Sequence, residues 1–181
     1  MIILGIDPGS TIMGYGIIDA PKNQPRLMLM GILDQRKIKD HYKRIASIFE
    51  RTLQLVRDYK PDAMAIESPF YGNNIQSMLK LGRAQGAAIS AALYQSVPVF
   101  EYAPRKIKQS ITGHGDASKE QIANLLQFIL KTELKPETLD ATDGLAAALC
   151  HFYQLSNPVK TGSSTSWSDY IRKNPNRIAG Q

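Results

Sequence analysis

The amino-terminal segment constrains the fold more than any other stretch of this chain. Residues 2–6 form a short apolar run, and Asp7, Pro8 and Gly9 follow it at once. This pattern predicts a buried strand that ends in a tight turn and carries one carboxylate at its end. Residues 14–18 then predict a second strand that returns beside the first. On this stretch alone, Asp7 could equally well do no more than cap its own turn.

The chain from there to about residue 153 predicts further strands and helices. We expect strands at 27–33, 63–67 and 97–102, and helices at 41–59, 75–95, from Ser118 onward, and from about 139 to 153. Three strands with short connections, followed by strands that alternate with helices, are typical of an α/β fold. The prediction is a five-stranded mixed sheet flanked by helices. Residues 1–155 form the expected domain, and the Asn-, Pro- and Ser-rich residues 156–181 form a tail.

Composition narrows the class of protein. The 181 residues are 43% hydrophobic and 21% charged, as in an ordinary globular domain, and no apolar run reaches membrane-spanning length. We expect a cytoplasmic protein with no membrane partner. The single Cys150 cannot form an internal disulfide and is expected to be a buried, idle thiol. The net charge of +6 favours a polyanionic partner, although many basic proteins bind no nucleic acid.

Carboxylates stand at the ends of the apolar elements. Asp7 and Glu67 each follow a predicted strand, while Asp140 and Asp143 share one face at the start of the last helix. Taken singly, Glu67 could form a salt bridge, and Asp140 and Asp143 could interact with the helix dipole. Four converging carboxylates, however, repel one another unless divalent cations neutralise them. Oxygen ligands without an imidazole cluster favour Mg²⁺ or Mn²⁺, and a pair of such ions about 4 Å apart promotes phosphodiester hydrolysis.

The four motifs of residues 5–10, 65–70, 79–86 and 140–143 resemble those of the RuvC-type Holliday junction resolvases, in the same order and at the same spacing. The resemblance extends from residue 2 to about 153. It implies an RNase H-like fold and a homodimer that nicks opposed strands of a four-way DNA junction during recombination and repair. It also implies two Mg²⁺ ions per active site, for which Mn²⁺ can substitute, and cooperation with the branch-migration proteins RuvA and RuvB.

The same resemblance assigns roles to individual residues. The metal-binding acids fall on Asp7, Glu67, Asp140 and Asp143, and the lysines of the catalytic region fall on Lys108 and Lys119. The aromatic residue that stacks on junction bases falls on Phe70. With these, the residues expected to contact DNA are Phe70, Tyr71, Asn74, Lys80, Arg83, Arg105, Lys106, Lys108 and Lys119.

Some positions depart from the family pattern or allow a simpler interpretation. Asn73 and Asp116 stand where basic residues are common in the family, which leaves individual phosphate contacts open. Phe70 could fold back onto the sheet. We expect the Gly113–Gly115 stretch to be flexible, and the lysines on either side of it could be solvated charges. The small residues of helix 75–95 could pack on the sheet alone, although we favour a dimer interface.

Two other classes of protein could share some of these features. Actin-like sugar kinases share the Asp-x-Gly-Ser turn after a strand, but they require a duplicated domain that this chain is too short to hold. A junction-binding protein without activity is disfavoured because an unused acidic cluster destabilises the fold. In the tail, Trp167, Tyr170 and Ile171 would share one face of a short docking helix, with disorder as the alternative.

Overall fold

The structure is a computed structural model that describes residues 1–21, 24–69, 74–133 and 139–156. Its elements follow the chain in the order expected from the sequence, with one additional helix. They are β1 (Ile2–Asp7), β2 (Ile12–Asp19), β3 (Arg26–Asp34), α1 (His41–Tyr59), β4 (Ala63–Glu67), α2 (Ile75–Tyr94), β5 (Val99–Tyr102), α3 (Pro104–Thr112), α4 (Lys119–Leu130) and α5 (Leu139–Ser156).

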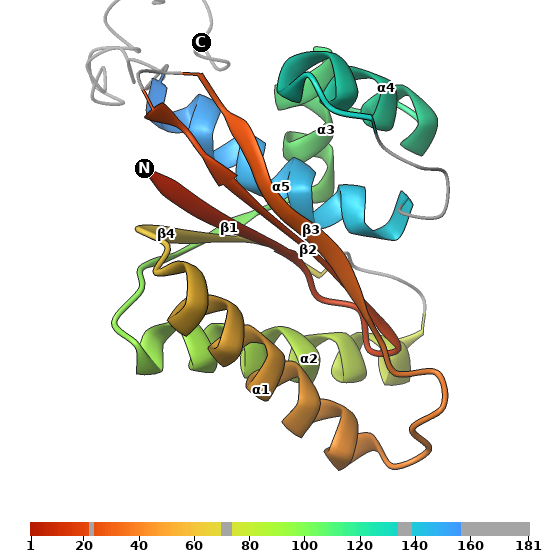
Figure 1. Cartoon of the computed structure of the whole chain (residues 1–181). Coiled ribbons are helices and arrows are strands. Elements are labelled where there is room, and N and C mark those ends of the chain that lie inside the picture. Colours follow the sequence, from red (N-terminus) through yellow and green to blue (C-terminus); the bar gives the residue numbers. More distant parts are fainter. Residues whose placement is uncertain (22–23, 70–73, 134–138, 157–181) are drawn as a thin grey trace, which may run out of the picture.

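The strands form one mixed sheet in the order β3-β2-β1-β4-β5. β2 is antiparallel to β1 and β3, whereas β4 is parallel to β1 and β5 is parallel to β4. The carboxyl ends of β1, β3, β4 and β5 therefore all lie at the same edge of the sheet. Helices α1 and α2 cover one face, and α5 with α3 and α4 covers the other (Figure 1). This confirms the predicted α/β class with a five-stranded mixed sheet.

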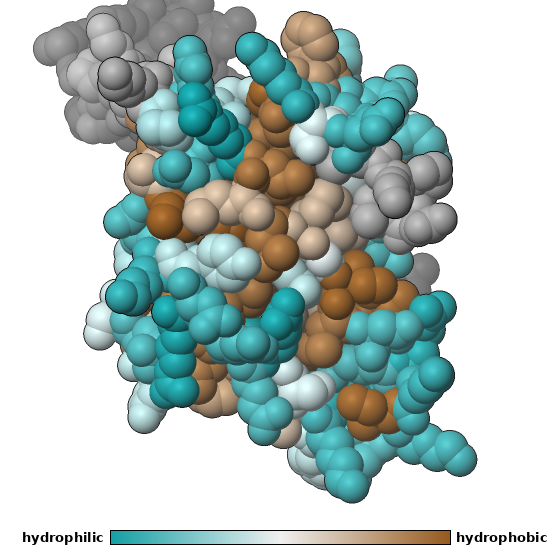
Figure 2. All heavy atoms as spheres, viewed as in Figure 1, coloured by the Kyte–Doolittle hydropathy of each residue, from teal (hydrophilic) through white to brown (hydrophobic). Residues whose placement is uncertain are grey.

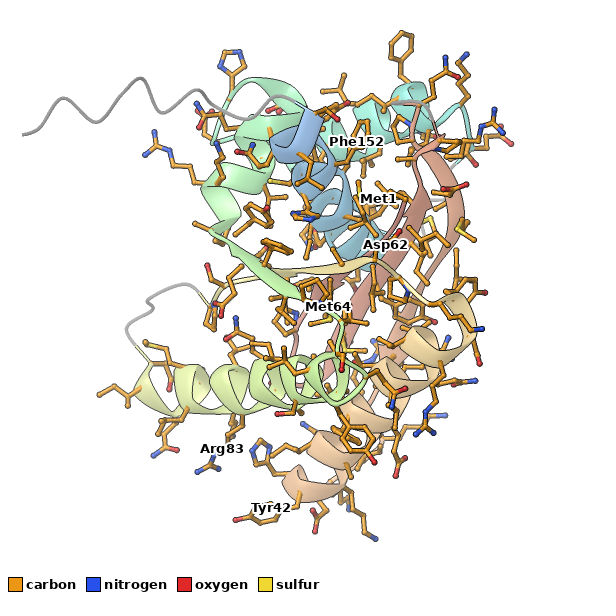
Figure 3. All side chains as sticks on the ribbon, turned by 90° about the vertical axis from the view of Figure 1, so that its left-hand side faces the viewer. Met1, Tyr42, Asp62, Met64, Arg83 and Phe152 are labelled. Atoms are coloured by element: carbon orange, nitrogen blue, oxygen red, sulfur yellow. The ribbon has the colours of Figure 1, made fainter. Side chains whose placement is uncertain are left out.

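Each face of the sheet has its own hydrophobic core, because successive side chains of a strand point to opposite faces. Ile3 of β1 packs with Leu145 and Leu149 of α5, whereas Leu4 packs with the side chains of α1 and α2. Met64 of β4 lies between the sheet and α2 (Figure 3). The prediction that Cys150 is buried is confirmed, since its side chain is fully inaccessible on the α5 face.

Helix α5 lies directly against the backbone of β1 and β2, which requires glycine on both sides of the contact. A Cβ atom added to Gly5 would lie 2.0 Å from the carbonyl oxygen of Gly144, and one added to Gly14 would lie 2.1 Å from that of Asp140. A Cβ atom on Gly16 would come within 2.6 Å of the Cα of Leu145. The glycines thus fix the start of α5 at the edge where the parallel strands end.

Helix α4 begins with a capping box at Ser118, where the sequence predicts the start of a helix. The Ser118 hydroxyl accepts from the Gln121 backbone, and the Gln121 side chain accepts from the Ser118 backbone. The sequence did not predict α3. In the Gly113–Gly115 stretch that follows α3, the Thr112 hydroxyl donates to the carbonyl oxygen of His114 and accepts from its backbone N–H. Only Ile107 of α3 is fully buried, so its apolar period is weak.

Several predictions concern residues outside the described ranges. These are the roles of Phe70 and Tyr71, the departure at Asn73, and the docking of the tail, and all of them stay predictions. The expected domain boundary after residue 155 also stays a prediction. Within the described ranges, none of the helices has the length and apolar character needed to cross a membrane.

Candidate active site

Strand register places the first two acids side by side. Ile6 pairs with Ile66, so Asp7 and Glu67 follow at neighbouring positions at the end of the sheet. Glu67 in turn pairs with Tyr102 of β5, and Asp7 pairs with Gly14 of β2. Strand alternation points this whole row toward α5. The prediction that these two strands end on the same edge with their carboxylates together is therefore confirmed.

The start of α5 brings the second pair of acids to this row. Asp143 lies in a pocket of about 360 Å³ together with Asp7, Glu67 and the lysines Lys108 and Lys119. Apolar side chains complete its lining, namely Pro104, Ile107, Ile122 and Ala146. Asp140, one turn earlier in α5, does not line the pocket; its side chain is half exposed, and it reaches the site through its ion pair with Lys119. The structure thus gathers the four predicted acids and both predicted lysines at one site.

Lys119 is the cationic partner of the α5 acids. Its Nζ lies 2.6 Å from Oδ2 of Asp143 and 3.5 Å from Oδ1 of Asp140. The hydrogen bond to Asp143 raises the pKa of Lys119, so the ammonium form is favoured. Lys119 is the first residue of α4, and the capping box at Ser118 holds it in place. Lys108 enters from α3, and its Nζ donates to the carbonyl oxygen of Ala117 at 3.0 Å.

The surroundings of the two strand acids disfavour their charged forms. Burial raises the pKa of Asp7 to about 6, with a further contribution from the charge of Asp143. Burial also raises the pKa of Glu67 to about 8, and the negative charge of Asp7 adds to this rise. Lys119 opposes both shifts without cancelling them. The site therefore has an unmet need for positive charge.

The donor set fits a hard divalent cation. Every acidic ligand offers carboxylate oxygens, and the lining of the pocket includes neither histidine nor cysteine. As the side chains stand, no three His, Cys, Asp or Glu residues in the described part of the chain are grouped closely enough to enclose an ion. Lys119 contacts two of the four acids instead, so metal binding would require Asp140 and Asp143 to exchange their ammonium partner for the metal.

The other described residues expected to contact DNA do not line this pocket. Lys80 and Arg83 are exposed on α2, and Arg83 projects from the side of α2 that faces away from the sheet (Figure 3). Arg105 and Lys106 are exposed in the first turns of α3. The side chain of Asn74 caps α2 by accepting from the backbone of Ser77 at 3.1 Å. Their roles in DNA binding stay predictions.

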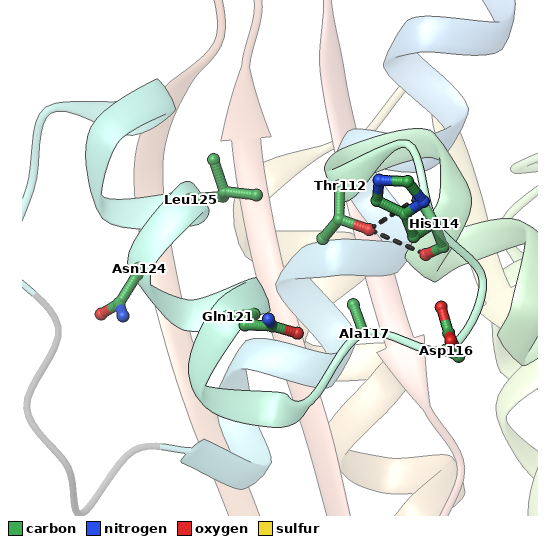
Figure 4. A pocket seen from close by; sticks show the side chains of 7 residues that line it. All are labelled: Thr112, His114, Asp116, Ala117, Gln121, Asn124 and Leu125. Carbon is green, nitrogen blue, oxygen red and sulfur yellow. Dashed lines mark hydrogen bonds between the residues drawn. The ribbon is translucent and has the colours of Figure 1, made fainter.

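A second hollow lies between the end of α3 and α4 (Figure 4). His114 and Asp116 line it with five other residues, and it shares no residue with the acidic pocket. His114 therefore lines a different hollow from the one that holds Asp7, Glu67 and Asp143. Asp116, where basic residues are common in the family, also faces this hollow and not the acids.

One polar pair beside the site was missed by sequence reasoning. The Tyr102 hydroxyl lies 2.7 Å from Nδ1 of His151, which is only 2% exposed on α5. The ring of Phe100 lies 4.3 Å from that of His151. The pair ties β5, whose Tyr102 is the register neighbour of Glu67, to the far half of α5. The position of Tyr102 at the end of a predicted strand was the only signal, and its partner 49 residues later could not be predicted.

Comparison of the chain with known proteins identifies its family. The model of the family described as "Crossover junction endodeoxyribonuclease RuvC" matches residues 3–151. The chain belongs to the RuvC family. The match includes all four acids and both lysines of the pocket, and it ends within α5.

RuvC proteins of known name match almost the whole chain. That of Bacteroides fragilis is 54% identical over 98% of this chain and 95% of its own length, and that of Porphyromonas gingivalis is 51% identical over 98% and 96%. Thermus thermophilus RuvC solved in complex with a Holliday junction substrate shows the same fold, with a TM-score of 0.79 and 32% identity over 86% of this chain and 94% of that chain. The predicted RNase H-like fold is thereby confirmed.

Proposed function

We propose that this chain is a Mg²⁺-dependent endonuclease that resolves four-way DNA junctions by paired nicks during homologous recombination and repair. The observation that carries the proposal is the pocket in which Asp7, Glu67 and Asp143 meet under two lysines. Membership of the RuvC family supports the substrate, because a relative that is 32% identical was solved on a Holliday junction. The nuclease domain proposed for this activity spans residues 1–155, and residues 156–181 form a tail.

The four acids are the proposed metal ligands. Asp7, Glu67, Asp140 and Asp143 would hold two Mg²⁺ ions, with Mn²⁺ as a substitute. When bound, the ions supply an activated water and stabilise the leaving oxygen of the phosphodiester. The inner part of the pocket is largely buried, and electrostatic interactions are stronger there because the dielectric constant is lower than in water.

The lysines of the pocket suit the charge of the scissile phosphate. Lys119, which pairs with Asp140 and Asp143 here, would be able to pair with a phosphate oxygen if these two acids held a metal ion. Lys108 is held by the carbonyl oxygen of Ala117 and keeps two further N–H donors for the same purpose. The exposed cations of α2 and α3, with Phe70 and Tyr71, are the proposed contacts to the rest of the junction.

A homodimer is proposed because the outer side of α2 is apolar and open. Ile75 is 72% exposed, Leu79 52% and Leu93 56%, whereas the opposite side of the helix buries alanines against the sheet and α1. A Cβ atom on Gly82 or Gly86 would meet no described atom within 4 Å, so a second helix could approach closely there. Two such sites would serve the opposed strands of a junction, with RuvA and RuvB as proposed partners in the cytoplasm.

The test of the proposal separates cleavage from binding. Each of Asp7→Asn, Glu67→Gln, Asp140→Asn and Asp143→Asn is expected to reduce nicking of a synthetic four-way junction in Mg²⁺ by at least about 100-fold. Junction binding should survive, because affinity depends on cations that contact phosphate. Asp58→Asn, an exposed acid of α1, is the matched control and should cleave normally. Near-normal nicking by Asp7→Asn would refute the site, and a wild type that binds junctions without nicking them would show a binding protein instead.

The dimer has a separate test by sedimentation. Leu79→Glu combined with Leu93→Glu places charges on the outer side of α2 and should shift the protein to monomers. Exposed Phe128→Glu on α4 is the control and should leave the dimer intact. A wild type that sediments as a monomer at all concentrations would contradict the proposed interface without affecting the acidic site.

A further inference from the structure

A basic loop lies at the same sheet edge as the acids, on the side away from α3 and α4. This basic loop, residues 35–40, connects β3 to α1 and carries Arg36, Lys37 and Lys39. β3 runs parallel to β1, so the loop leaves the sheet where Asp7 lies. The backbone N–H of Gln35 donates to the carbonyl oxygen of Thr11 at 2.8 Å, which joins the loop to the turn that follows Asp7. Figure 1 shows the loop beside that turn.

The backbone of the basic loop is held in place. Gln35 is fully buried, and its Nε2 donates to the carbonyl oxygen of Arg44 at 2.7 Å and to the hydroxyl of Ser47. Arg44 Nε in turn donates to the carbonyl oxygen of Ile38 at 2.6 Å, and the Asp40 side chain caps α1. A loop fixed at its start, middle and end loses little conformational entropy when it binds a ligand.

The cations of the loop point into solvent. Arg36 forms an ion pair with Asp34, at 2.6 Å between Nη2 and Oδ2, and its side chain remains 65% exposed. Lys37 and Lys39 are exposed, and neither makes an ion pair within 4.0 Å with a described residue. Figure 2 shows hydrophilic side chains projecting at the lower right of the molecule, where Figure 1 places this loop. Two unpaired ammonium groups on a fixed support form a preorganised site for anions.

The position of the loop indicates which anion it binds. Lys108 and Lys119 line the pocket of the acids from α3 and α4, and the basic loop lies at the same edge of the sheet, where β3 ends beyond β2. The acids therefore lie between two groups of cations, at the edge of the sheet. A DNA backbone that crosses the acids at its scissile phosphate would extend neighbouring phosphates toward both groups, because phosphates repeat every few ångströms along a strand.

We infer that Lys37 and Lys39 of the basic loop bind the sugar–phosphate backbone of a junction arm beside the scissile phosphate, as a second clamp opposite the α3 and α4 lysines. The inference rests on the proposed function for the identity of the DNA. Arg36 has a different role within the clamp, since its pairing with Asp34 keeps the first residue of the exposed segment in place. The contact is with backbone only, so it adds affinity without sequence preference.

The test measures the salt dependence of junction binding. The variant Lys37→Gln with Lys39→Gln is compared with Arg26→Gln with Arg57→Gln, which removes the same charge from exposed residues at the opposite edge of the sheet. Dissociation constants for a fluorescent four-way junction are measured in EDTA over a range of salt concentrations. The loop variant should bind about 10-fold or more weakly at low salt, with a salt slope smaller by roughly 2, because each lost phosphate contact removes about 0.9. The control should match the wild type.

The outcomes separate this inference from the proposed function. Equal affinity and salt slope for the loop variant and its control would overturn the clamp, whatever the wild type cleaves. A wild type that fails to nick junctions in Mg²⁺ would overturn the proposed nuclease, while a reduced slope in the loop variant would still support the clamp. Equal melting temperatures of the two variants confirm that the difference arises from binding.

Discussion

On one face of the sheet, α5 touches the strands backbone to backbone, whereas on the other face α1 and α2 pack through side chains. The contacts of Gly5, Gly14 and Gly144 on the α5 face would not admit a methyl group, while the α1 and α2 face is filled by side chains such as Leu4, Ile48 and Ala88. Side chains hold a helix at a distance that can vary with repacking, but a backbone contact has almost no freedom. The face that fixes its helix most tightly is the one that positions the acids.

The largest effect is expected from a methyl group at Gly14. Gly14→Ala places a Cβ atom against the carbonyl oxygen of Asp140, so α5 must move away from β2. Overpacking of this kind costs roughly 1–3 kcal/mol or more in the free energy of unfolding, measured with urea. Ile48→Val removes one methylene from the core on the α1 face and should cost only about 0.5–1.5 kcal/mol, because the side chains there can repack in part. Equal stability of the two variants would remove the distinction between the faces.

Removing protons from the acids should destabilise the metal-free protein. The pKa of Asp7 is about 6 and that of Glu67 about 8 when folded, because of burial, against ordinary values near 4 in the unfolded chain. The folded state thus holds protons that the unfolded state has released, and stability falls as pH rises from about 4 to about 8. Each tenfold difference in proton affinity is worth about 1.4 kcal/mol, or roughly 3–6 °C in melting temperature.

The measurement is the melting temperature in EDTA across this pH range. Glu67→Gln should flatten the decline and be more stable than the wild type at pH 8, whereas Glu50→Gln, an exposed acid on α1, should leave the decline unchanged. Added Mg²⁺ should restore much of the lost stability in the wild type and in Glu50→Gln, but not in Glu67→Gln, because a ligand that binds the folded state stabilises it. A wild type that grows more stable from pH 4 to pH 8 in EDTA would contradict the charge balance described for the site.

The smallest difference concerns one tyrosine hydrogen bond on each face. Tyr102→Phe leaves the buried His151 without its partner on the α5 face and should cost about 1–3 kcal/mol. Tyr15→Phe removes a bond from Arg51 on the α1 face, at 2.5 Å, but Arg51 is partly exposed and also donates to Gln54. That change should cost about 1 kcal/mol or less. The ranking is checked by urea unfolding, and a reversed order would show that His151 finds another partner.

The sequence predicted most of the strands, helices and acids because these depend on local pattern. Apolar runs that stop on Asp7 and Glu67 mark strand ends, and the spacing of Asp140 and Asp143 marks one helix face. It did not predict α3, whose single buried residue Ile107 leaves no clear period.

Contacts between distant segments were also beyond local pattern. The pairing of Lys119 with Asp143, 24 residues away, and of Tyr102 with His151 depends on where α4 and α5 come to lie. The role of the glycines in β1 and β2 could not be predicted either, because a glycine in a sequence does not indicate which segment of backbone will pack against it. Burial of the polar Gln35 depends on α1, which only the fold brings to it.

The central claim is that α5 and the strand ends together form a divalent-metal site. The most direct measurement is anomalous X-ray scattering from crystals of the protein grown with Mn²⁺. We expect anomalous density between the carboxylates of Asp7, Glu67 and Asp143. The ammonium of Lys119 should no longer contact Asp143. Crystals in which Lys119 keeps its contact with Asp143, and Mn²⁺ binds elsewhere or not at all, would contradict it.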